Sequence, residues 1–444
     1  MFIGAAGLGF ADLLSRSAEF LGHFSQCGLN ISGVRRISQI YEQEGHSENL
    51  LQSIATLRTW VFLLAMLGMC LTVLVSPLIA HFLLDDQGDY TTCLALAPLV
   101  ALCTLLGGEA TILKATHQLK KLALCTAGGA FTTLCVAAIL YPTMGISGVL
   151  PVLIFSILSL FGIHLYATTR HYPYQLRINR EGIRDGLPII RLGISFAFTG
   201  VIASGAEVFV RYFIKSQASD AEVGFYAAAF TLVVSYSRII FAAVDADYYP
   251  RLSAIVENQQ EMNTIVNRQI NALVMLMTPF LIGFSIALPF IVVVLYSEEF
   301  LCVIPMVLAA LNYMFFKAVY TPTAMLALAK GDAKIFLLME TLYNLVFVLA
   351  VSIGYAQNGL LGAGIGLTIA NLYDLIAINI VYSYRYGYVI DRKTLLHTMI
   401  QFALLAVVLF LCFTHSNWVK YGFGTLFFIM SCCLSYHTYR IQKN

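Results

Sequence analysis

The stretch GFADLLSRSAEFLGHFSQCGLNISGVRRISQI (residues 9–40) aligns without a gap with GFYAAAFTLVVSYSRIIFAAVDADYYPRLSAI (residues 224–255). Gly9 falls on Gly224 and Arg36 falls on Arg251, at an offset of 215 residues. Fixed-offset self-similarity is the sequence mark of an internal repeat. These two stretches therefore predict a chain built from two related halves.

Further matches keep nearly the same offset. Pro77 faces Pro289, and YPTMGISG (141–148) faces YAQNGLLG (355–362) with both glycines matched. The offset stays at 212–215 over about 170 residues, so the series is not a coincidence. A complete repeat holds an even number of spans, which predicts halves of equal orientation related by an axis along the membrane normal.

The composition indicates an all-α polytopic membrane protein. The chain is 59% hydrophobic and 11% charged, with a mean hydropathy of +0.80, whereas soluble domains carry about a quarter charged residues. Apolar runs such as 59–84 and 270–296 exceed the roughly 20 residues that a membrane helix needs. None of the ten cysteines forms a CxxC pair, so we expect neither a disulfide framework nor a metal site, and no cofactor.

About thirteen transmembrane helices are predicted, with loops that alternate in charge. Twenty Lys and Arg residues fall on one side and two on the other, so the positive-inside rule predicts a cytoplasmic C-terminus. The predicted spans lie near 8–34, 59–84, 91–114, 121–141, 145–168, 188–214, 222–250, 269–296, 300–328, 334–354, 359–385, 395–413 and 419–438.

The repeat predicts two pseudo-symmetric six-helix bundles followed by two further C-terminal helices. Span 188–214 opens the second repeat, and its counterpart would precede Met1, so the first helix of the N-terminal bundle is expected to be missing. The predicted domains are an N-terminal bundle (1–168), a cytoplasmic linker (169–187), a C-terminal bundle (188–386) and two extra helices (387–444).

Four ionisable residues share one predicted helix. Asp12, Arg16, Glu19 and His23 are spaced by four, three and four residues, which places them on one helical face. Each would cost about 2.5–3.5 kcal/mol at the centre of a bilayer, so such residues face partners or an aqueous cavity.

The repeat extends this polar stripe to a second helix. Adding 215 maps His23 to Arg238 and Asn30 to Asp245. We therefore expect two symmetry-related helices to line one central space, with Asp245 among its polar residues.

Other buried charges complete the set of candidates. Glu207 and Arg211 form an i,i+4 pair in span 188–214, Lys317 lies midway through span 300–328, and Asp374 is a candidate ion or proton site. Two interpretations remain open: satisfied ion pairs between helices, or a cationic cavity for a phosphate or diphosphate, which Arg binds bidentately and Lys as a point charge. The sequence predicts these buried cations: Arg16, Arg211, Arg238 and Lys317.

Three motifs resemble a known superfamily. AEVGFYAAAFTLVVSY (221–236), YYPRLSAI (248–255) and ALAKGDAK (327–334) are similar to the polysaccharide-transport branch of the multidrug/oligosaccharidyl-lipid/polysaccharide (MOP) superfamily, and most of all to Wzx-type O-antigen flippases. The resemblance implies that a polyprenyl-diphosphate-linked oligosaccharide is flipped to the outer leaflet by alternating access. It also implies that the four buried cations bind the diphosphate.

The resemblance further implies a multi-pass protein of the bacterial inner membrane, with membrane lipids and possible polysaccharide polymerase and chain-length proteins as partners, and no nucleic acid. A small-molecule or drug cation antiporter of the same superfamily is the alternative function. A membrane glycosyltransferase is disfavoured because no predicted outer loop exceeds about ten residues. We therefore expect a transporter and not an enzyme.

Overall fold

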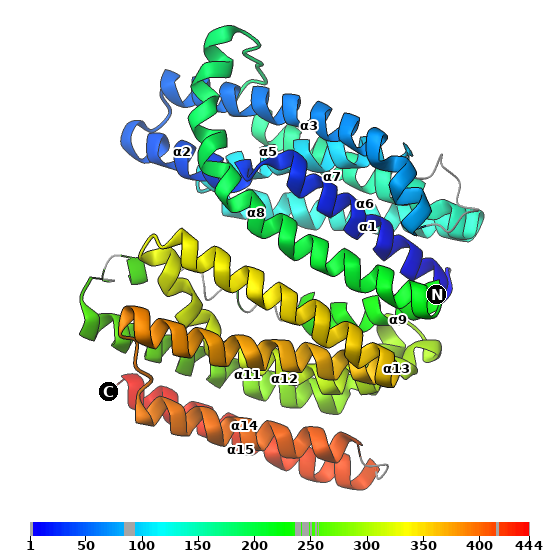
Figure 1. Ribbon diagram of the computed structural model, residues 1–444, viewed down its shortest axis with the longest axis vertical. Coiled ribbons are helices and arrows are strands. Elements are labelled where there is room, and N and C mark those ends of the chain that lie inside the picture. Colours follow the sequence, from blue (N-terminus) through cyan, green and yellow to red (C-terminus); the bar gives the residue numbers. More distant parts are fainter. Residues whose placement is uncertain are drawn as a thin grey trace. The chain divides into compact units, whose positions relative to one another are not determined.

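The computed structural model describes residues 3–83, 94–235, 241, 248, 251–253, 255, 257–413 and 417–443. These residues are nearly all helical and include no strand, which confirms the all-α prediction (Figure 1). The α-helices whose bounds the structure describes are α1 (Gly4–Gln26), α2 (Leu29–Glu44), α3 (Glu48–Leu83), α5 (Leu96–Ala115), α6 (Leu119–Met144), α7 (Val149–Thr169), α8 (Arg180–Gln217), α9 (Asp220–Phe230), α11 (Gln259–Leu295), α12 (Ile304–Ala329), α13 (Ala333–Tyr386), α14 (Arg392–Phe413) and α15 (Asn417–Lys443).

The chain divides into two compact units, Phe2–Tyr212 and Phe213–Asn444, each of which is described by itself. The division falls within α8, at a different place from the linker 169–187 expected from the repeat. The repeat-based domain boundaries follow sequence similarity and stay predictions.

In the first unit, α1, α5 and α7 enclose an apolar core that includes Leu14, Leu99 and Val149. Helix α6 adds only the half-buried Tyr141 to the edge of this core: Cys125 and Gly129 are its buried residues, and Leu124 is 72% exposed. Large exposed apolar side chains on a helix are what a lipid-facing position requires.

In the second unit, α12 is the central helix. It packs against α11, α13 and α14, and most of its residues are buried. Helices α14 and α15 pack against α11 and each other. The two C-terminal helices are therefore part of this unit's packed structure.

Eight ranges of the described helices are long and apolar enough to cross a membrane. Two of them, Leu119–Thr169 and Ala333–Tyr386, have 51 and 54 residues. A crossing needs about 20 residues, so each is long enough for two. A plan of thirteen crossings is compatible with these ranges.

Each of these two long ranges contains a break in its helix, and the backbone angles at the two breaks match. Gly145 has φ 58° and ψ −134°, and Gly359, 214 residues later, has φ 55° and ψ −139°. His117 (φ 55°) and Gly331 (φ 69°) are a second pair at the same offset. A positive φ is rare outside glycine, so the shared breaks indicate one inherited backbone path.

The span predicted over 8–34 is two helices, not one. Helix α1 ends at Gln26, and Cys27 (φ 46°) and Gly28 (φ 68°) are both left-handed. A Cβ atom on Gly28 would lie 2.0 Å from the carbonyl oxygen of Gly193 in α8. The break therefore lets the junction of α1 and α2 approach the α8 backbone.

Candidate functional site

Glycines on α8 allow α1 to lie close beside it. A Cβ atom on Gly200 would lie 3.0 Å from Nδ1 of His23, and one on Gly205 would lie 3.0 Å from the ring of Phe20. Small residues permit this approach between membrane helices. The packing brings the polar face predicted on α1 against α8.

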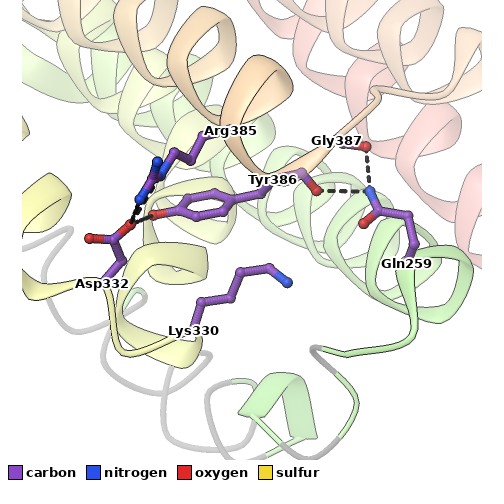
Figure 2. Close-up of a pocket in the computed structure, with 6 residues that line it drawn as sticks. All are labelled: Gln259, Lys330, Asp332, Arg385, Tyr386 and Gly387. Carbon is purple, nitrogen blue, oxygen red and sulfur yellow. Dashed lines mark hydrogen bonds and ion pairs between the residues drawn. The ribbon is translucent and has the colours of Figure 1, made fainter.

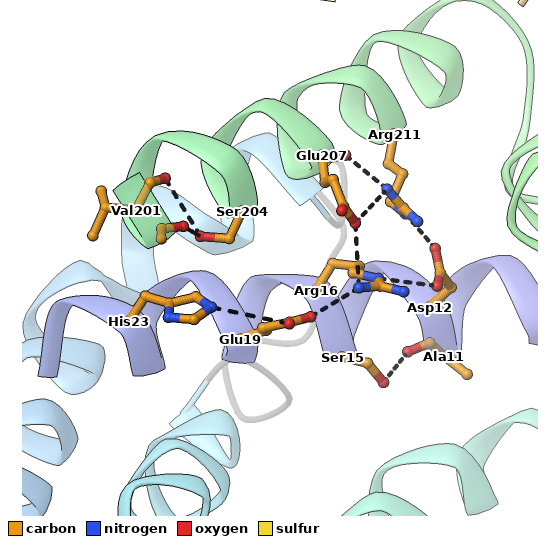
Figure 3. Close-up of polar contacts among 11 residues, drawn as sticks. Ala11, Asp12, Ser15, Arg16, Glu19, His23, Val201, Ser204, Glu207 and Arg211 are labelled. Carbon is orange, nitrogen blue, oxygen red and sulfur yellow. Dashed lines mark hydrogen bonds and ion pairs between the residues drawn. The ribbon is translucent and has the colours of Figure 1, made fainter. Parts of the chain in front are cut away.

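Six ionisable side chains meet between these helices, and we call them the α1–α8 cluster (Figure 3). They include all four residues predicted to share a face of α1 and the i,i+4 pair of α8. The α1–α8 cluster consists of Asp12, Arg16, Glu19, His23, Glu207 and Arg211.

Arg16 contacts acids on both helices. Its Nη1 lies 2.9 Å from Oε2 of Glu19 and 3.2 Å from Oε2 of Glu207, while its Nε lies 3.6 Å from Oδ1 of Asp12. The Arg16 side chain is 20% exposed. Its charge is therefore compensated within the cluster, although the side chain stays accessible.

Arg211 is fully buried. Its Nε donates to Oδ2 of Asp12, and its Nη1 donates to the backbone oxygen of Glu207 at 3.0 Å and lies 3.5 Å from Oε2 of the same residue. A buried guanidinium needs such partners to offset its desolvation. These contacts are those of an ion pair that holds helices together, one of the two interpretations left open by the sequence.

The α1–α8 cluster holds one more acid than permanent cation. Among the described residues, Asp12, Glu19 and Glu207 contact two guanidinium groups, and Nε2 of His23 lies 4.0 Å from Oε1 of Glu19. The cluster has the composition to bind one further proton or small cation.

A second group of polar residues lies inside the unit Phe213–Asn444, and we call it the α12–α13 cluster. Asn371 is fully buried; the hydroxyl of Tyr320 donates to its Oδ1 at 3.0 Å, and its Nδ2 donates to the hydroxyl of Tyr343 at 3.2 Å. The α12–α13 cluster consists of Lys317, Tyr320, Glu340, Tyr343, Asn371 and Asp374.

Lys317 is the cation of the α12–α13 cluster. Its Nζ lies 5.6 Å from the ring centroid of Tyr313 and 5.9 Å from that of Phe241, within the range of cation–π attraction. Glu340 and Asp374, which is 6% exposed, both interact electrostatically with Lys317. Two carboxyl groups again face one permanent cation.

Two predicted site residues, Arg238 and Asp245, lie outside the described residues. The helix that would carry them is described at its start, where α9 passes at Thr231 into a π-helical turn over Thr231–Ser235. Such turns are frequent at functional sites.

Arg58 was not among the buried cations predicted from the sequence, and the structure corrects that prediction. Arg58 and Glu109 are 2% and 3% exposed and form two hydrogen bonds of 2.8 Å. Nη1 of Arg58 also donates to the backbone oxygens of Tyr172 and Pro173 at 3.0 and 2.9 Å. Helix α3 begins at Glu48, so Arg58 lies well inside it and not in the loop that its charge suggested.

A separate open pocket of about 550 Å³ lies where α12 meets α13 (Figure 2). Asp332 accepts hydrogen bonds there from Nη2 of Arg385 at 3.0 Å and from the hydroxyl of Tyr386 at 3.2 Å. The residues 214 positions before Asp332 and Tyr386 are Gln118 and Tyr172. Gln118 donates a hydrogen bond to the hydroxyl of Tyr172 at 3.3 Å. This contact is thus a repeated structural feature of the two halves.

The fold is that of a MOP-superfamily transporter. An inward-facing multidrug resistance MATE family transporter matches with a TM-score of 0.71 and 14% identity, covering 87% of this chain and 92% of its own. The lipid II flippase MurJ, in an inward closed conformation, matches with a TM-score of 0.69 and 15% identity, covering 99% and 98%. A MOP transporter from Pyrococcus furiosus matches with a TM-score of 0.57 and 16% identity, covering 86% and 91%.

Residues 19–305 match the model of a family described as polysaccharide biosynthesis proteins. The chain belongs to this family of polysaccharide biosynthesis proteins, and it is a multi-span membrane protein with a transporter fold. No curated protein sequence matches it.

Proposed function

We propose that this protein flips a polyprenyl-diphosphate-linked oligosaccharide, an O-antigen or related surface polysaccharide repeat unit, from the cytoplasmic to the outer leaflet by alternating access. The observation that carries the proposal is the extent of the match to the lipid II flippase, which covers 99% of this chain. The matches to the multidrug transporters leave 13–14% of this chain uncovered. Family membership supports the same substrate class, because polysaccharide biosynthesis needs its lipid-linked units moved.

Buried cations supply the chemistry for the diphosphate. Arg16 is the accessible guanidinium of the α1–α8 cluster, and Lys317 is the ammonium of the α12–α13 cluster. Both are proposed to bind diphosphate oxygens, as are Arg238 and, once its contacts with Asp12 and Glu207 open, Arg211. Since Arg16 already contacts three carboxylates, a diphosphate would replace some of these contacts.

The acid excess in each cluster supports coupling to a proton or small cation. We assign this role to Asp374 in the α12–α13 cluster, and to Asp12, Glu19, His23 and Glu207 in the α1–α8 cluster; Asp245 stays a candidate for the same role. The variant Asp374→Asn keeps the size of the side chain and removes its charge. It should slow transport and flatten its dependence on pH, while Asp391→Asn should not.

Deletion of the gene in its host tests the function. Loss of surface polysaccharide, with complete lipid-linked units retained on the cytoplasmic leaflet, is expected. Units that still reach the outer leaflet would favour the alternative function, a small-molecule or drug cation antiporter, and resistance to cationic drugs on overexpression would then be measured.

A further inference from the structure

A second pocket, of about 370 Å³, lies in the unit Phe213–Asn444 and takes no part in either polar cluster. One wall is a face of α11, another is the last part of α15, and Arg251 of the YYPRLSAI motif completes it. The lining residues are Arg251, Ile265, Arg268, Gln269, Ala272, Met275 and Tyr439.

The pocket is positively charged. Arg251 and Arg268 both line it and both are exposed, and no carboxylate is among the lining residues. No acid pairs with Arg268 in the part of the chain that the structure describes. Two guanidinium groups that line one pocket favour an anionic ligand there.

Gln269 provides an independent sign of a ligand site. Its side chain is 8% exposed, yet its Nε2 has no hydrogen-bond partner among the described residues. Buried donors in proteins are almost always paired. An acceptor oxygen of a ligand in this pocket would satisfy the amide.

The donor set fits a phosphate group. Guanidinium groups bind phosphate with bidentate, charge-assisted hydrogen bonds. The amide of Gln269 and the hydroxyl of Tyr439 can donate as well. A phosphate ester offers enough acceptor oxygens for all four side chains.

The rest of the pocket is apolar and lies deeper along the same helix. Ala272 and Met275 follow Arg268 on one face of α11, at four and seven residues further from the end that the charge pattern places in the cytoplasm. A ligand that matches this gradient has an anionic head and a hydrocarbon tail. We propose that this pocket binds the phosphate of an anionic lipid, which would join α15 to α11 and to Arg251.

Lipid binding to the purified, delipidated full chain tests this proposal by native mass spectrometry. The probes are phosphatidylglycerol, phosphatidylcholine with the same acyl chains, and inorganic phosphate as a competitor. The variant is the double substitution Arg251→Gln and Arg268→Gln. The matched control is Arg170→Gln with Arg440→Gln, which removes two exposed charges on the same predicted side.

The first phosphatidylglycerol should bind at least about tenfold more weakly to the pocket variant, since each charge-assisted hydrogen bond contributes roughly a factor of ten. The control should bind like the wild type. Gln269→Leu should weaken binding without lowering the melting temperature of the lipid-free protein. Competition by inorganic phosphate would show that phosphate alone suffices; absence of competition would show that the lipid tail is needed as well.

Two results would overturn the proposal. One is an equal loss in the pocket variant and the control, which would mean unspecific attraction to a basic surface. The other is equal binding of phosphatidylcholine and phosphatidylglycerol by the wild type.

Discussion

Arg58 and Glu109 form a buried ion pair that was not predicted from the sequence. Glu109 lies within an apolar run of the sequence. A carboxylate buried there needs a cationic partner, and this need was the available signal for the ion pair. The partner lies 51 residues away in a segment that looked like a loop because it is charged. Periodicity places residues on a helix face, but it does not report which distant helix faces it.

Replacing Arg58 by Ala should lower the stability of the protein by about 3–5 kcal/mol, because Glu109 would become a buried charge without a partner. Thermal unfolding in detergent measures this. Arg170→Ala, an exposed arginine, should stay within about 0.5 kcal/mol. An Arg58→Ala protein that melts like the wild type would refute the assignment of this pair.

Lys317→Gln should abolish surface polysaccharide while the amount of protein in the membrane stays normal, since the α12–α13 cluster loses its only permanent cation among the described residues. Immunoblots and glycan staining measure the two quantities. Lys334→Gln, an exposed lysine, is the control. Unchanged polysaccharide in the Lys317 variant would exclude this residue from the substrate site.

Asp332 gives a pH-dependent contribution to stability. Desolvation opposes its ionisation, but hydrogen bonds from Arg385, from the backbone of Ile335 and from Tyr386 outweigh it and lower the pKa of the carboxyl below its ordinary value. A lowered pKa stabilises the folded state above the unfolded-state pKa, and this contribution is lost as the pH falls through the folded-state pKa.

Asp332→Asn keeps a residue that can cap α13 but removes the charge. The variant should melt below the wild type at neutral pH, and the difference should disappear in acid, below the folded-state pKa. Melting curves from pH 7 to pH 3 measure this. A difference that does not change with pH would contradict the role of the charge.

At the scale of elements, the repeat carried most of the predictable information. The helices on either side of Gly145 and Gly359, and the matched turns at His117 and Gly331, follow from the same offset that the sequence shows. The break after Gln26 was missed although Gly28 is of the residue type that commonly ends a helix, and the close contact that accompanies the break, with Gly193, lies 165 residues away.

Gly28→Ala should therefore cost more than Gly387→Ala. Both glycines are left-handed, with φ and ψ of 68° and 14° for Gly28 and of 64° and 24° for Gly387, so both substitutions carry about 1–2 kcal/mol of backbone strain. Only Gly28 has backbone atoms where the Cβ would lie; at Gly387 the nearest atom is the end of the Gln259 side chain, which can move. Melting temperatures of the two variants compare them, and equal losses would contradict the close approach of the α1–α2 junction to α8.

At the scale of the whole molecule, composition and the repeat were sufficient for the fold class, and the motifs for the coarser class, a polysaccharide biosynthesis protein with a transporter fold; the Wzx-type specificity stays a proposal. The sites were less predictable. The stripe on α1 was placed correctly on one face, but its partners on α8 depend on how helices pack, which spacing alone does not specify. The pocket at Arg251 was missed because Arg268 and Tyr439 are far apart in the sequence.

The most direct test of the proposed function is the leaflet location of lipid-linked oligosaccharide in a deletion strain, with and without the wild-type gene restored. An impermeant reagent that modifies only outward-facing glycan measures it. We expect complete units to be protected from the reagent in the deletion strain and accessible after the gene is restored. Equal accessibility in both strains would contradict a flippase.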